Sequence, residues 1–108
     1  MIHTMAQKPI IFAMANPMPE ILTELALKAG AAVVATGRSD YPNQINNSLA
    51  FPGIFRGALD NKVTKITDSM KIKAAQNLAA LVKKPVANKI IPGPFEKGIS
   101  QAVARAIR

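Results

Sequence analysis

The stretch that decides the fold of this chain is residues 9–37, which read PIIFAMANPMPEILTELALKAGAAVVATG. A continuous apolar run stands at each end, over residues 9–15 and residues 31–36. Such runs, without polar alternation, are typical of strands buried on both faces of a parallel sheet. Between them, Pro19 suits the first turn of a helix. Apolar side chains then recur at helical spacing: Ile21, Leu22, Leu25 and Ala29. The stretch predicts a strand, a short helix and a second strand parallel to the first.

The rest of the chain predicts helices and no further strand, which makes two strands and three to four helices in all. The downstream helices are expected over residues 51–59, about 68–83 and roughly 99–107. In the first of these, Gly53 and Gly57 leave a smooth face for close packing against another backbone. Thr67 can cap the second helix, and Asn77 is expected on its polar side. Residues 85–98 are rich in proline and glycine and predict a loop.

A sheet of two parallel strands is an incomplete architecture, because natural parallel sheets have more strands and cover both faces. We therefore expect the neighbouring strands to come from another chain or, as we favour, from a longer chain of which this is the end. The open strand edges and the outer face of the helix over residues 51–59 predict self-association of the chain alone.

Composition excludes several classes of function. The chain has 108 residues, no cysteine and a single histidine, His3. The lack of cysteine rules out disulfide scaffolds, thiolate zinc sites and cysteine nucleophiles, and a residue so near the N-terminus is a poor catalyst because chain ends fray. No apolar run approaches the roughly 18 residues of a membrane-spanning helix, and no signal peptide is recognisable. We expect a soluble, cytoplasmic protein without a membrane partner.

The net charge of +8 raises the question of nucleic acid. The fourteen Lys and Arg residues are scattered, the longest run is Lys83-Lys84, and no aromatic residues alternate with them to stack on bases. This pattern favours a solvated basic surface and no nucleic-acid partner.

Two polar loops are the candidate ligand-binding segments. Asn16 follows the first predicted strand, and the polar stretch over residues 37–48 follows the second. In open α/β sheets, ligands bind outside the carboxyl ends of the strands. The amides have two interpretations: Asn16 can form an Asx-type turn and Asn46 or Asn47 can cap the next helix, or they can bind a carboxylate or carboxamide. Local spacing does not decide between these interpretations.

Longer strings are more specific than these spacings. The chain reads IIFAMANP over residues 10–17, ATGRSDYPNQINN over residues 35–47 and FPGIFRGAL over residues 51–59. In order and spacing these strings resemble the C-terminal part of a malic enzyme, especially the short bacterial and archaeal form called malate oxidoreductase. ITDSMK over residues 66–71 and IIPGPF over residues 90–95 continue the resemblance more loosely.

The resemblance implies the α/β fold of the C-terminal part of a Rossmann-type NAD(P)-binding domain, with residues 1–108 forming an incomplete domain. It implies oxidative decarboxylation of malate to pyruvate and CO2 by a homo-oligomer that uses NAD or NADP and Mg²⁺ or Mn²⁺. Asn16, Gly37 and Asn46 would then contact the cofactor. Asn16, Asn46 and Asn47 would contact the substrate. Gly37 would let the backbone approach the cofactor closely.

The resemblance also implies what this chain does not carry. The family's catalytic tyrosine and lysine, its three acidic metal ligands and its glycine-rich fingerprint lie N-terminal to the matching region. No catalytic or metal-binding residue is therefore assigned here, the missing N-terminal part is the expected partner, and the isolated chain is expected to be inactive. Two other hypotheses are a stand-alone interaction module with a relict dinucleotide-binding fold and a small basic nucleic-acid-binding protein.

Overall fold

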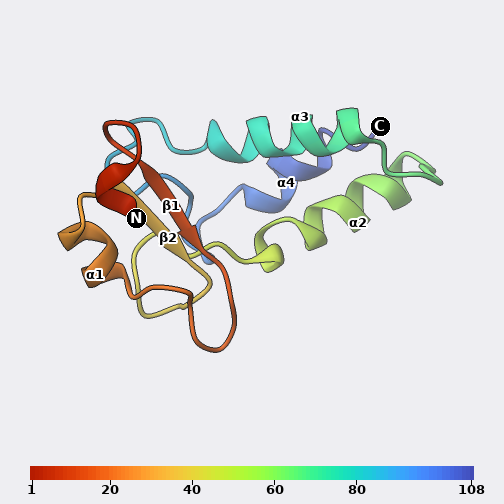
Figure 1. The fold of residues 1–108 in the computed structure, drawn as a ribbon. Helices are drawn as coiled ribbons and strands as arrows, with labels where there is room; N and C mark the ends of the chain where they lie inside the picture. The colour runs from red at the N-terminus through yellow and green to blue at the C-terminus, as the bar shows by residue number, and fades with distance from the viewer. The chain divides into compact units, whose positions relative to one another are not determined.

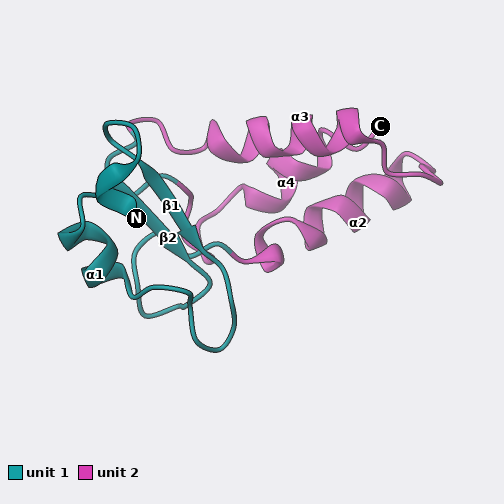
Figure 2. Cartoon of the chain, viewed as in Figure 1, with its two compact units in different colours: residues 1–45, 85–90 teal, residues 46–84, 91–108 magenta.

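The computed structural model describes residues 1–108 without a gap. The chain divides into two compact units, residues 1–45 with 85–90 and residues 46–84 with 91–108 (Figure 2). The elements in chain order are the 3₁₀-helix η1 (Ile2–Thr4), strand β1 (Ile10–Ala13), helix α1 (Thr23–Lys28), strand β2 (Val33–Thr36), the 3₁₀-helix η2 (Asn47–Leu49), and helices α2 (Phe51–Asp60), α3 (Asp68–Ala79) and α4 (Ile99–Ala104). None of the helices is long and apolar enough to cross a membrane.

The first unit contains the predicted strand, helix and strand (Figure 1). Strands β1 and β2 pair in parallel, in register from Ile10 opposite Val33 to Ala13 opposite Thr36. This confirms the two apolar runs as neighbouring parallel strands. Helix α1 crosses between them and buries Ala26 against the sheet, in a small core with Ala31 and Val34.

Helix α1 begins later than predicted. Its N-cap is Leu22, so the expectation that Pro19 lies in the first turn is wrong. The reason is a contact of the preceding turn: the Ala15 N–H donates to the Glu20 carboxylate at 2.9 Å. Residues 16–20 therefore close a turn after β1 instead of starting the helix.

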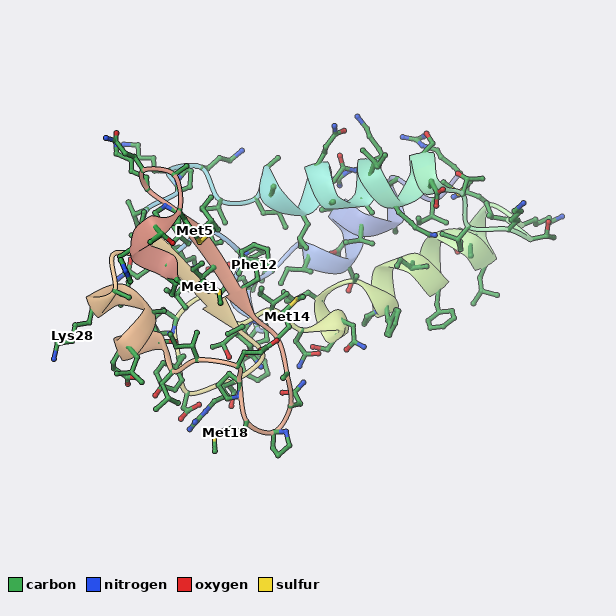
Figure 3. All side chains as sticks on the ribbon, viewed as in Figure 1. Met1, Met5, Phe12, Met14, Met18 and Lys28 are labelled. Carbon is green, nitrogen blue, oxygen red and sulfur yellow. The ribbon has the colours of Figure 1, made fainter.

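The expectation that both strands are buried on both faces holds only for β2. Val34 and Ala35 of β2 are buried, whereas Ile10 and Phe12 of β1 are 61% and 50% exposed. Figure 3 shows Phe12 projecting away from the sheet and Met14 at the end of β1. No other strand in the chain pairs with β1, so one edge of the sheet is open.

The second unit is a packing of three helices. The glycines of α2 allow it to approach α4 closely: a Cβ on Gly53 would lie 2.6 Å from the Ser100 carbonyl oxygen, and one on Gly57 would lie 2.6 Å from the Ala104 carbonyl oxygen. This confirms the smooth face predicted from the spacing of the two glycines. The core of the unit is formed by buried side chains of α3 and of the C-terminal segment: Ala74, Val103, Ala106 and Ile107.

Helix α3 is capped as predicted, because the Thr67 hydroxyl accepts a hydrogen bond from the Met70 N–H at 3.2 Å. It ends at Ala79, earlier than expected. The placement of Asn77 on the polar side is wrong: its amide donates to the Ala102 carbonyl oxygen at 2.9 Å and so fastens α3 to α4. The side-chain amide satisfies a carbonyl at this helix interface that no apolar neighbour could satisfy.

Candidate functional site

The structure brings Asn16 and Gly37 together. Asn16 lies three residues beyond β1, and Gly37 directly follows β2. A Cβ on Gly37 would stand 3.1 Å from Asn16 Oδ1 and 3.4 Å from Asn16 Nδ2, so the side-chain amide lies directly over the glycine backbone. The loops that follow the two strands therefore meet at the carboxyl edge of the sheet, where ligands of open α/β sheets bind.

The Asn16 amide is exposed and available. No hydrogen bond of the Asx type engages it, and the turn around it, with a cis Asn16–Pro17 peptide bond, is closed by Glu20 instead. The hydrogen bond from the Ala15 N–H holds the pKa of the Glu20 carboxyl below its ordinary value. A side-chain amide with a free donor and a free acceptor is suited to a carboxylate or a carboxamide.

The loop after Gly37 is shaped by charged and aromatic side chains. Arg38 holds Asp40 through two hydrogen bonds of 2.9 and 2.6 Å, and its guanidinium lies 5.0 Å from the centre of the Tyr41 ring. The bond from Arg38 keeps the pKa of Asp40 low. Tyr41 donates its hydroxyl hydrogen to Glu24 of α1 at 2.8 Å, which raises the pKa of the phenol. These exposed pairs order the loop and leave no free base in it.

Asn46 and Asn47 lie in the second unit. Asn46 Oδ1 accepts from the Ser48 N–H at 3.0 Å and caps η2, which confirms the capping interpretation for Asn46. Asn47 is the first residue of η2, and both side chains are exposed. The cap uses only the oxygen of Asn46, so its NH2 group remains available to a ligand.

One residue of this region was missed by the sequence reasoning. Asn43 is buried, with only 7% of its surface exposed, and it is one of two buried polar residues in the chain. It stands inside the string that carries the resemblance, but so do many other residues. The available signal was the residue type, because asparagine tolerates the left-handed backbone conformation found here (φ +57°).

The chain holds no cluster of three or more His, Cys, Asp or Glu side chains that could bind a metal ion. The residues present therefore do not fit a metal site of their own. They do fit a polar ligand, since the missing side chain of Gly37 leaves room for the Asn16 amide, whose donor and acceptor are exposed.

Comparisons with known proteins identify the family of the chain. The family model described as malic enzyme, NAD binding domain, matches residues 1–108. The bifunctional malic/malolactic enzyme of Bacillus subtilis is 58% identical over 109 residues, covering 99% of this chain and 27% of the relative. The NAD-dependent malic enzyme of Geobacillus stearothermophilus is 51% identical, covering 98% of this chain and 22% of the relative.

Among solved structures, the malic enzyme from Pyrococcus horikoshii superposes with a TM-score of 0.94 at 57% sequence identity. The match covers 98% of this chain and 24% of that chain. The chain thus spans about a quarter of the length of the proteins it matches.

Proposed function

Because this chain belongs to the malic enzyme family, as part of its NAD-binding domain, we propose that it forms part of the nicotinamide and malate pocket of an NAD(P)-dependent malic enzyme. The reaction is the oxidative decarboxylation of malate to pyruvate and CO2. NAD or NADP would be held in part by Asn16, Gly37 and Asn46, and when bound it would supply the hydride acceptor for malate. The chain contributes binding and orientation, and the catalytic acid and base come from the part of the family's chain that it does not span.

The observation that carries this proposal is the contact between Asn16 and Gly37. Gly37 has no side chain, so the Asn16 amide can lie against its backbone, and a Cβ there would crowd Asn16 Oδ1 at 3.1 Å. The Asn16 amide beside it donates to, and accepts from, a carboxamide or donates to a carboxylate. Because the amide is uncharged, it orients the ligand without changing the charge of the pocket.

We also propose that Asn46 contacts the cofactor and that Asn46 and Asn47, both exposed, contact the substrate. The Asn46 NH2 group, left free by the cap on Ser48, donates to a carboxylate oxygen or to the cofactor. Asn47 binds malate. The Mg²⁺ or Mn²⁺ of the proposed reaction takes its ligands from elsewhere, since this chain has no suitable cluster. We further propose a homo-oligomeric, cytoplasmic enzyme and an isolated chain without activity.

A chimera tests the proposal. The matching segment of the Bacillus subtilis relative, which aligns over 109 residues, is replaced by this chain, and malate-dependent reduction of NAD and NADP is measured. We expect an active chimera and an inactive isolated chain. Asn16→Ala should then lower kcat/KM for malate by roughly tenfold or more, because it removes a positioned polar group. The matched control is Asn88→Ala, another exposed amide of the first unit that lies outside the proposed pocket.

A chimera that folds and does not oxidise malate contradicts the proposal. So does an Asn16→Ala variant that is as active as the Asn88→Ala control.

The alternative is a stand-alone interaction module, which the exposed side chains of Ile10, Phe12 and Met14 favour. Under this alternative the isolated chain binds a partner through the open edge of β1, and malate has no effect on binding. Under the enzyme function, Asn16→Ala lowers malate oxidation by the chimera. Under the interaction-module function, Phe12→Ser abolishes binding of the partner and Asn16→Ala does not.

A further inference from the structure

Both donors and the oxygen of the Asn43 side-chain amide are hydrogen-bonded inside the first unit. Its Nδ2 donates to the carbonyl oxygens of Val34, at 3.0 Å, and Ala87, at 2.8 Å. Its Oδ1 accepts from the Ile90 N–H at 2.9 Å. A buried amide with all of these partners fixes the two backbone segments it contacts, β2 and residues 85–90, because breaking any one bond leaves a buried polar group unpaired.

The main chain of Asn43 closes the loop that follows β2. Its carbonyl oxygen accepts from the Thr36 N–H at 3.3 Å, and two residues later the Ile45 N–H donates to the Thr36 carbonyl oxygen at 2.8 Å. Residues 37–44 therefore leave β2 at Thr36 and return to the same residue. We call the closure formed by Thr36, Asn43 and Ile45 the neck of the loop. The side chain of Asn43 bonds the neck to Val34 of β2 and to residues 85–90.

Gly37 is the first residue of this closed loop, and its backbone lies against the Asn16 amide. A shift at Thr36, which bonds Asn43 and Ile45 and directly precedes Gly37, moves Gly37 relative to Asn16. A residue of the proposed pocket therefore stands at the start of the segment that Asn43 anchors.

We propose that Asn43 is a positioning residue of this pocket: its buried amide clamps the neck of the loop and residues 85–90 onto β2, and so holds Gly37 against Asn16. The link to catalysis rests on the proposed function. The clamp itself depends only on hydrogen bonds within this chain.

Asn43→Gly isolates the role of the amide. Glycine adopts the φ of +57° without strain, so this variant removes the three side-chain hydrogen bonds and leaves the backbone free to keep its conformation. Asn43→Asp keeps the acceptor for the Ile90 N–H and loses both donated bonds. It should be at least as damaging, because a carboxylate would then face two carbonyl oxygens.

Asn61→Ala is the matched control. The Asn61 amide also donates to two main-chain carbonyl oxygens, those of Gly57 at 3.0 Å and Ile107 at 2.9 Å, but it lies in the second unit. Its loss removes the same kind of interaction without touching the clamp.

The first readout is hydrogen exchange of the 108-residue chain. In Asn43→Gly, the amides of Ile45 and Ile90 should exchange at least about tenfold faster than in the unsubstituted chain, because the local opening of their hydrogen bonds becomes easier. In Asn61→Ala they should exchange at the unsubstituted rate. Unchanged exchange of both amides in Asn43→Gly overturns the clamp, whatever the chimera does.

The second readout is steady-state kinetics of the chimera. Asn43→Gly should lower kcat/KM for malate by roughly tenfold or more, while Asn61→Ala, at a similar loss of melting temperature, leaves it unchanged. Equal losses in the two variants reduce Asn43 to a structural residue and overturn the positioning role. An unsubstituted chimera that folds without activity overturns the proposed function, and with it the catalytic link, while hydrogen exchange still decides the clamp.

Discussion

Replacing Gly53 by alanine should drive α2 and α4 apart. A Cβ at this position would stand 2.6 Å from the Ser100 carbonyl oxygen and 2.6 Å from Val103 Cβ, both on α4. An ordinary van der Waals contact needs at least 3.4 Å. The backbone oxygen cannot turn away as a flexible side chain does, so the whole of α4 has to move.

The net cost follows from two opposing effects. Alanine stabilises a helix by up to about 1 kcal/mol relative to glycine. Overpacking of a close interface costs about 1–3 kcal/mol, and the contact at Gly53 belongs at the upper end because backbone atoms are involved. We expect a net loss of about 1–2 kcal/mol in the free energy of unfolding. In a domain of this size each kcal/mol lost lowers Tm by roughly 4–8 °C.

Thermal and urea unfolding of the 108-residue chain, followed by far-UV circular dichroism, measure this loss. Gly93→Ala is the control, since the nearest atom to its added Cβ is 3.9 Å away and the substitution acts mainly on the unfolded chain. A Gly53→Ala variant at least as stable as Gly93→Ala would refute the reasoning about the helix contact.

Three further predictions concern the first unit. The depressed pKa of Glu20 means that its bond to the Ala15 N–H contributes stability above the ordinary pKa of a glutamate, and that this stability is lost as the pH falls through the folded-state pKa; Glu20→Gln should remove this part of the acid sensitivity, and an NMR titration that places Glu20 at or above its ordinary pKa would contradict it. Glu24→Gln should bring the pKa of Tyr41 back toward its ordinary value, because the hydroxyl loses a charged acceptor, and ultraviolet titration of the phenol measures the shift. The isolated chain should self-associate through the open face of β1, and Phe12→Ser should weaken this; sedimentation that finds a monodisperse 11.5 kDa monomer at high concentration would count against it.

Much of the fold was predictable because it depends on local pattern. The apolar runs specified two strands and their parallel pairing, and the spacing of Gly53 and Gly57 indicated a helix contact that the structure contains. Helix ends were less predictable. Pro19 favours a helix start by its own conformation, but a hydrogen bond to Glu20 competes for the same residues and delays the helix to Thr23.

The candidate site was also predictable in part. The meeting of the loops at Asn16 and Gly37 followed from the parallel strands, because the carboxyl ends of such strands share one edge of the sheet. The role of Asn43 did not follow, since its partners Ala87 and Ile90 lie 44 and 47 residues away in the chain. No local spacing signals which distant carbonyl a buried amide will reach.

The sequence by itself determined the pair of parallel strands, the helices that follow them and the family to which the chain is similar, because apolar periodicity, caps and long motif strings are properties of neighbouring residues. Only the tertiary structure decided which amides are buried and which are free. Asn16 and Asn43 are the same residue type in similar polar loops, yet the side chain of Asn16 is exposed and that of Asn43 is buried and makes three hydrogen bonds. The difference arises because burial and hydrogen-bond partners depend on segments that come together only in the folded chain.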